Sequence, residues 1–184
     1  MNLSIKKYLI SDNQFRVFAI DKNSISDCKL ENKIACLSAL TTTLLSEEER
    51  ITFNFKNKNY ESFLYIDSFS HNYSHYRLEN DKISLTSTKL LVTKSKLKNF
   101  GASYNSIMQF DKFNILKNIS AFYKESEQME TYFIENESTI LMIQPLPFFD
   151  EVQYDLLKEE LSNDQNHWLE EYLIDTNEIS VLKQ

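Results

Sequence analysis

Strands are predicted wherever apolar and polar residues alternate along the chain. Residues 50–56 read Arg-Ile-Thr-Phe-Asn-Phe-Lys, so every second side chain is apolar, as in a strand with one face in water. Residues 62–67 are apolar on both faces, which predicts a central strand in a hairpin with 50–56. Residues 6–10 and 14–20 flank a polar turn and predict another strand pair. Weaker patterns predict further strands at 74–78, 82–87, 89–95, 103–110, 130–135 and 139–144.

Helices are predicted where apolar residues recur every three or four positions. Such a stripe runs through 30–45, and its width indicates a buried helix. A second stripe runs through 115–123, and Asp111 before it is a suitable N-cap. After Pro147, two more stripes predict helices with Glu and Asp on their opposite faces.

These elements predict an α+β protein with a C-terminal helical appendage. A chain of 184 residues fits one domain of ordinary size, and a chain of that length buries about 70% of its unfolded surface. We expect a core domain over residues 1–147 and a helical tail over 148–184 that packs on or near the core. The sequence contains no long linker, internal repeat or low-complexity tract that would indicate a further domain.

Glycine is nearly absent, which affects how the chain can turn. The sequence has one glycine, where average usage of about 7% gives roughly a dozen. Turns that need a positive φ must therefore use Asn or Asp, which tolerate the left-handed region better than other residues. The asparagines expected at such turns are Asn13, Asn57, Asn59, Asn80 and Asn136.

Charge and hydropathy exclude two classes of partner. The net charge is −7, and no Lys/Arg cluster is dense enough to neutralise phosphates, so nucleic-acid binding is not expected. No apolar run approaches the ~18 residues of a membrane span, and the first residues do not resemble a signal peptide. We therefore expect a cytoplasmic protein with no membrane partner. The acid-rich tail leaves two interpretations open: a helix that binds a basic protein, or a docked helix with a solvated face.

The residues that carry chemistry do not form a recognisable catalytic or metal site. Cys28 and Cys36 are spaced neither as a CxxC pair nor as zinc ligands, and Cys36 lies beside a buried apolar stripe. His71 and His75 are four residues apart, but the segment between them resembles a loop or strand, and no third ligand is near. An exposed polar pair is the simpler interpretation. Without a nucleophile and base, an enzyme is the least favoured class.

Two short motifs and the opening strand carry a family resemblance. Residues 122–128 read Phe-Tyr-Lys-Glu-Ser-Glu-Gln, residues 143–147 read Ile-Gln-Pro-Leu-Pro, and residues 7–10 read Lys-Tyr-Leu-Ile. They resemble the Tyr-Phe-x-x-Ser-Glu-Gln, Leu-Gln-Val-Met-Pro and opening Tyr-Leu segments of the 33 kDa chaperonin family, the redox-regulated heat-shock holdase chaperones of bacteria. The likeness covers roughly residues 4–162. The signature residues, which we expect to be structural, are Tyr123, Ser126, Glu127, Gln128, Gln144 and Pro147.

The resemblance implies a fold and an activity. The implied fold is a β/α/β three-layer sandwich, in which two sheets enclose helices. The implied function is ATP-independent, holdase-type binding of unfolded or partly folded client proteins in the cytoplasm. The alternative is a degenerate chaperone-like scaffold or regulatory subunit bound to one fixed partner. The oligomeric state stays open, with a homodimer as one option.

The sequence departs from the family pattern at the redox sensor. Family members carry four cysteines in a zinc module, as Cys-x-Cys and Cys-x-x-Cys, and neither motif occurs here. The family's Gly-x-Gly-Pro turn is replaced by Asn-Lys-Asn-Tyr at residues 57–60. We therefore expect no zinc or other cofactor, and binding without a redox switch. We expect part of the tail to act as a lid over apolar surface of the core. The residues expected to form this lid are Trp168, Leu169, Tyr172 and Leu173.

Overall fold

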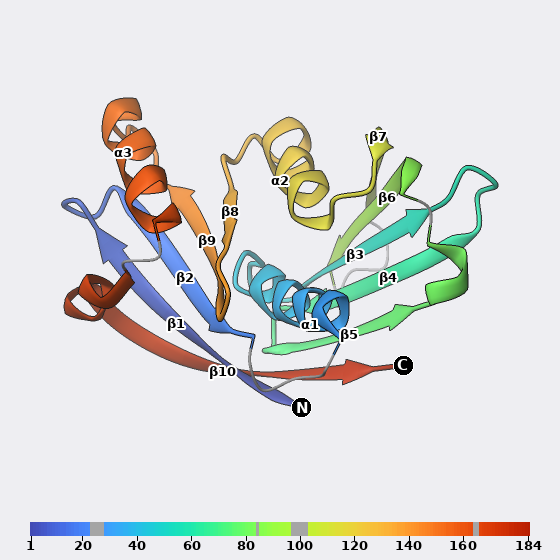
Figure 1. Ribbon diagram of the computed structural model, residues 1–184, viewed down its shortest axis with the longest axis horizontal. Helices are drawn as coiled ribbons and strands as arrows, with labels where there is room; N and C mark the ends of the chain where they lie inside the picture. The colour runs from blue at the N-terminus through green and yellow to red at the C-terminus, as the bar shows by residue number, and fades with distance from the viewer. Residues whose placement is uncertain (23–27, 84, 97–102, 164–165) are drawn as a thin grey trace.

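The computed structural model of the protein describes residues 1–22, 28–83, 85–96, 103–163 and 166–184 (Figure 1). The strands are β1 (Asn2–Ile10), β2 (Phe15–Asp21), β3 (Glu49–Lys56), β4 (Ser62–Phe69), β5 (Tyr73–Leu78), β6 (Thr86–Lys96), β7 (Ser103–Lys112), β8 (Tyr132–Glu135), β9 (Thr139–Pro145) and β10 (Leu173–Lys183). The α-helices are α1 (Lys29–Thr42), α2 (Ile115–Ser126) and α3 (Glu151–Ser162), and the 3₁₀-helices are η1 (Asn80–Lys82) and η2 (Asn166–Tyr172). In these described ranges, no helix is both long enough and apolar enough to cross a bilayer.

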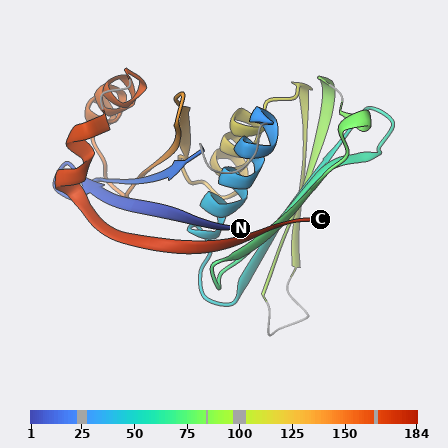
Figure 2. The ribbon, with the colours of Figure 1, turned by 60° about the horizontal axis from the view of Figure 1, so that its bottom comes forward.

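The protein is α+β, and its described strands form a single sheet. The strand order is β7-β6-β3-β4-β5-β10-β1-β2-β9-β8. The expectation of two separate sheets is wrong because β10 joins the two halves: Ser180 pairs with Asn2 of β1 on one side and with Tyr73 of β5 on the other. The halves, β3 to β7 and β1-β2-β9-β8, lie on either side of α1 and α2 (Figure 1), and Figure 2 shows β10 running from one half to the other.

The tail is helical only in its first part. Helix α3 confirms the helix predicted from the first apolar stripe after Pro147. The 3₁₀-helix η2 lies where the second helix was predicted. The prediction of a helix is wrong for residues 173–183, which form β10. Ile179 and Val181 of this strand are fully buried, while Ser180 between them is exposed, so the period is that of a strand. The tail therefore contributes a central strand of the sheet.

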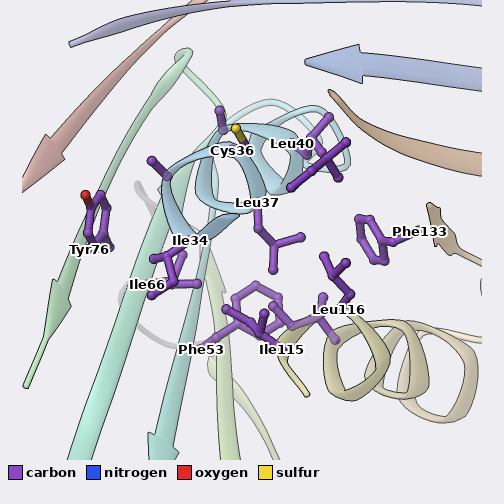
Figure 3. Packing of buried hydrophobic residues seen from close by; sticks show 14 of the residues in the cluster. Ile34, Cys36, Leu37, Leu40, Phe53, Ile66, Tyr76, Ile115, Leu116 and Phe133 are labelled. Carbon is purple, nitrogen blue, oxygen red and sulfur yellow. The ribbon is translucent and has the colours of Figure 1, made fainter. Parts of the chain in front are cut away.

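Two apolar cores pack on opposite faces of the β1-β2-β9-β8 half. The larger core lies between the halves and surrounds α1, whose residues 34–42 are all buried. Figure 3 shows Leu37 of α1 pointing toward Phe53 and Ile115 in this core. The smaller core lies under α3, where Phe15 of β2 stacks on Tyr154 with ring centroids 5.8 Å apart. Helix α3 thus covers the outer face of this half.

Two predicted boundaries are wrong because β6 and β7 form a longer pair than their sequence pattern indicates. The strand predicted at 82–87 begins only at Thr86, which pairs with Lys112 at the end of β7. That pairing keeps Asp111 in the strand, so it does not cap α2. Asn114 is the N-cap, and its side-chain oxygen accepts a hydrogen bond from the backbone N–H of Lys117 at 3.1 Å.

The turns use several residue types in place of glycine. Nine described residues have a positive φ, and Asn13 is the only predicted asparagine among them. At the β3–β4 turn the left-handed residue is Tyr60, with φ 66°. Asn57 stabilises that turn with its side chain, whose Oδ1 accepts from the backbone N–H groups of Asn59 (2.9 Å) and Glu61 (3.1 Å).

Candidate functional site

Helix α3 is fixed at its start and along its inner face. Asp150 caps the helix, because its Oδ1 accepts hydrogen bonds from the backbone N–H groups of Val152 (2.8 Å) and Gln153 (3.1 Å). The side chains that hold the inner face on the smaller core are Tyr154, Leu157 and Leu161. The cap holds only the first turn, and the smaller core contacts only the inner face. The outer face of the helix is therefore exposed to solvent.

The outer face of α3 and the turn just before it carry three large apolar side chains that face solvent. Phe148, Val152 and Leu156 are 102%, 68% and 55% exposed. Val152 and Leu156, four residues apart, lie on one side of the helix, opposite the inner face. Phe148 lies just before the N-cap Asp150, outside the helix. Phe148 has a φ of 68°, a left-handed conformation that is unfavourable for an aromatic residue, and such strain collects at functional sites. We call these three side chains the α3 stripe.

The residues predicted to form a lid do not act as one unit. Leu169 is buried in the smaller core, on the inner side of α3. Trp168 is half-buried and meets Tyr172 edge-on, with ring centroids 5.8 Å apart. Tyr172 and Leu173 are 40% and 39% exposed. Of the four, only Trp168 and Leu169 therefore pack on a core.

Five of the six signature residues meet near the end of α2. Ser126 Oγ lies 2.9 Å from the Ser106 hydroxyl of β7. Glu127 Oε2 accepts a hydrogen bond from Lys94 Nζ of β6 at 2.9 Å. Gln128 takes a positive φ of 53° and turns the chain. These contacts anchor the helix end to β6 and β7.

The other signature residues extend this corner toward β9. Gln144 is buried and its amide contacts the sulfur of Met129, whose backbone N–H donates to the Tyr123 carbonyl at 3.0 Å. Pro147 lies outside the corner and is exposed. The geometry is that of a structural joint between α2 and two parts of the sheet, and the sequence could not reveal it because its members are distant along the chain.

The Tyr123→Phe variant is expected to be more stable than the native protein by about 1 kcal/mol, because it removes a buried hydroxyl without a hydrogen-bond partner. The Tyr123 side chain is buried and its Oη has no partner within the described residues. Burial raises the pKa of Tyr123, and the Glu127 and Glu49 carboxylates raise it further. Urea unfolding measures the change. Tyr65→Phe is the control with no expected gain, because the Tyr65 hydroxyl accepts from Arg50 Nη2 at 3.4 Å; a destabilised Tyr123→Phe would contradict the prediction.

A buried ion pair lies on the outer face of the β3–β7 half. Asp67 is fully buried, and its carboxylate accepts from Arg50 Nε at 2.8 Å, Arg50 Nη2 at 2.6 Å and Thr52 Oγ1 at 2.9 Å. His75 Nε2 lies 3.6 Å from the same carboxylate. The expectation that both histidines are exposed is wrong for His75, whose side chain is 14% exposed; His71 is exposed. This network fastens three neighbouring strands to one another.

The residues of the chain do not fit the zinc site of the implied family. Within the described residues, no group of three or more His, Cys, Asp or Glu side chains could hold a metal ion. Cys36 is buried in α1, and burial raises the pKa of its thiol to about 12, so it is protonated at neutral pH.

Comparison with known proteins identifies the family. Residues 21–183 match the family described as Hsp33 protein, so the chain belongs to the Hsp33 family of chaperones. The solved 33 kDa chaperonin (heat shock protein 33 homolog) of Thermotoga maritima is similar in fold, with a TM-score of 0.72 over 99% of this chain and 80% of that chain. The two sequences are 13% identical, so that likeness concerns the fold. No curated protein matches the sequence. The resemblance stated from the sequence is confirmed.

Proposed function

We propose that the protein holds non-native polypeptides without ATP and without a redox switch, and that the α3 stripe is a binding surface. The observation that carries the proposal is the exposure of Val152 and Leu156 on one face of α3 and of Phe148 just before the helix. An apolar surface of this kind on a soluble domain marks an interaction site. Membership of a chaperone family supports non-native clients as the partners. We place this activity in the cytoplasm, as the family implies.

The size of the stripe fits weak and reversible capture. Burying one large apolar side chain stabilises a contact by about 1.5–3 kcal/mol, and association costs at least about 4 kcal/mol in translational and rotational freedom. Three such side chains therefore leave a net gain on the order of a few kcal/mol, which corresponds to roughly millimolar affinity for each bound segment. A holdase benefits from that range, because it must release clients without an energy source.

The Phe148→Ser/Val152→Ser/Leu156→Ser variant is expected to lose at least half of the suppression of client aggregation. The assay follows light scattering by a heat-unfolded enzyme, with the full chain present and with neither ATP nor oxidant added. The three positions are exposed, so the variant should fold as the native protein does, and circular dichroism checks this. Leu85→Ser is the matched control, because Leu85 is 71% exposed but lies between η1 and β6.

Two outcomes would count against the proposal. Undiminished suppression by the triple variant would remove the α3 stripe from the binding surface. No suppression by the native protein, together with capture of one partner at fixed stoichiometry, would favour the alternative scaffold or regulatory subunit.

A further inference from the structure

The acidic residues of the chain are concentrated around the α3 stripe. Between Asp150 and Glu178 the sequence carries ten acidic residues and one lysine. The remaining residues carry seventeen acidic and nineteen basic side chains, a net charge of +2. The whole negative charge of the protein therefore belongs to the segment of α3, η2 and the start of β10.

Helical spacing places acidic side chains beside the apolar ones. Residues three and four apart are neighbours on a helix surface. Asp155 is therefore the neighbour of Val152, and Glu159 and Glu160 are neighbours of Leu156, and all three acidic residues are exposed. The stripe is an apolar surface with an acidic rim.

The stability of α3 does not explain this rim. Glu159 and Glu160 lie in the last turns of the helix, where negative charge opposes the helix dipole, and the last turn has no basic residue. Among the described residues, no ion pair engages Glu151, Glu159 or Glu160. Lys158, the one lysine of the helix, pairs with Asp155 at 2.6 Å and lies over the Tyr154 ring at 4.3 Å. The acidic rim therefore remains available to a partner.

We propose that the α3 stripe selects extended segments of non-native polypeptide in which apolar residues are flanked by Lys or Arg. This inference rests on the proposed function and specifies the class of client. Opposite charges speed encounter and select partners, while like charges reject them. The same charge disfavours a second copy of the chain on this surface, because two acidic rims would then face each other.

Peptides that differ only in their flanks test the selection. Three labelled peptides share one apolar centre and carry flanking Lys, Gln or Glu, and fluorescence anisotropy gives the Kd of each for the full-length protein. We expect the Lys peptide to bind about tenfold more tightly than the Glu peptide at low salt, which corresponds to about 1.4 kcal/mol. The ratio should shrink at high salt, because the Debye length falls from about 30 Å at 0.01 M to about 3 Å at 1 M.

Charge-neutralising variants locate the effect. In Asp155→Asn/Glu159→Gln/Glu160→Gln, the ratio of the two Kd values is expected to fall to about twofold or less, as the charges of the rim are removed. The matched control makes the same change in net charge at exposed acidic residues outside the tail, and it should keep the native ratio. Its substitutions are Asp12→Asn, Asp81→Asn and Asp111→Asn.

Each outcome supports or overturns the inference. An unchanged ratio in the α3 variant, or an equal loss in the control, overturns it. Equal binding of the three peptides, reduced by the triple serine variant, overturns the selection but leaves the proposed function standing. No binding of any peptide counts against the proposed function itself. A folded basic protein that competes as well as the Lys peptide overturns the assignment to non-native segments.

Discussion

A chain truncated after Tyr172 is expected to lose cooperative folding. The truncation removes β10, which separates β1 from β5 in the middle of the sheet. It deletes the fully buried Ile179 and Val181 and leaves two strand edges unpaired. Losses of about 2–5 kcal/mol for each large buried aliphatic side chain approach the whole stability of a domain, about 5–15 kcal/mol. Thermal unfolding followed by circular dichroism measures the effect.

Point variants on β10 control for the truncation. Ile179→Ala is expected to cost about 2–5 kcal/mol, because the side chain is fully buried. Leu182→Ala, three residues further along, should cost less than about 1 kcal/mol, because Leu182 is 49% exposed. A truncated chain that unfolds cooperatively near the native temperature would show that β10 is dispensable.

The Asp67→Ala variant is expected to be destabilised by about 3 kcal/mol, the lower end of the range for breaking a buried ion pair. The carboxylate is fully buried and accepts from Arg50 and Thr52, so its loss leaves both donors without their partner. The cost stays at the lower end because the Arg50 side chain is 39% exposed and can reach water. Urea unfolding of both proteins gives the difference in the free energy of unfolding.

Two further variants define what the Asp67 measurement means. Asp111→Ala removes an exposed carboxylate and should change stability by less than about 0.5 kcal/mol. Asp67→Asn keeps an acceptor for Thr52 but removes the charge, so we expect a loss between those of the two alanine variants. A loss below about 0.5 kcal/mol for Asp67→Ala would contradict a structural role for the ion pair.

Local sequence pattern predicted the elements whose buried face extends over most of their length. Residues 50–56 alternate because Ile51, Phe53 and Phe55 are buried, and this strand was predicted nearly to its ends. The buried stripe of α1 was equally clear. The prediction of a helix for residues 173–183 was wrong because it extended the helical spacing of four apolar residues at or before the start of this segment. Those residues are Trp168, Leu169, Tyr172 and Leu173. Within 173–183 itself, apolar and polar residues alternate over only a few positions.

Long-range pairing lay beyond the sequence pattern. The union of the two half-sheets depends on Ser180 pairing with both Asn2 and Tyr73, which nothing local indicates. The ion pair of Asp67 likewise requires strands β3, β4 and β5 to be aligned. The α3 stripe could have been found, because Phe148, Val152 and Leu156 recur at intervals of four. It was missed because the inner face of the same helix is apolar too.

The position of β10 has a consequence for synthesis on the ribosome. The first strand of the chain pairs with the last, and the Met1 amino group donates to the Val181 carbonyl at 2.8 Å. A nascent chain thus holds β1 and β5 with open edges until residues 173–183 leave the exit tunnel. At about 5–20 residues per second, synthesis of the roughly 100 residues from the end of β5 to the end of β10 keeps the chain in that incomplete and aggregation-prone state for roughly 5–20 s. A domain of a chaperone family is thus itself open to aggregation until β10 has emerged.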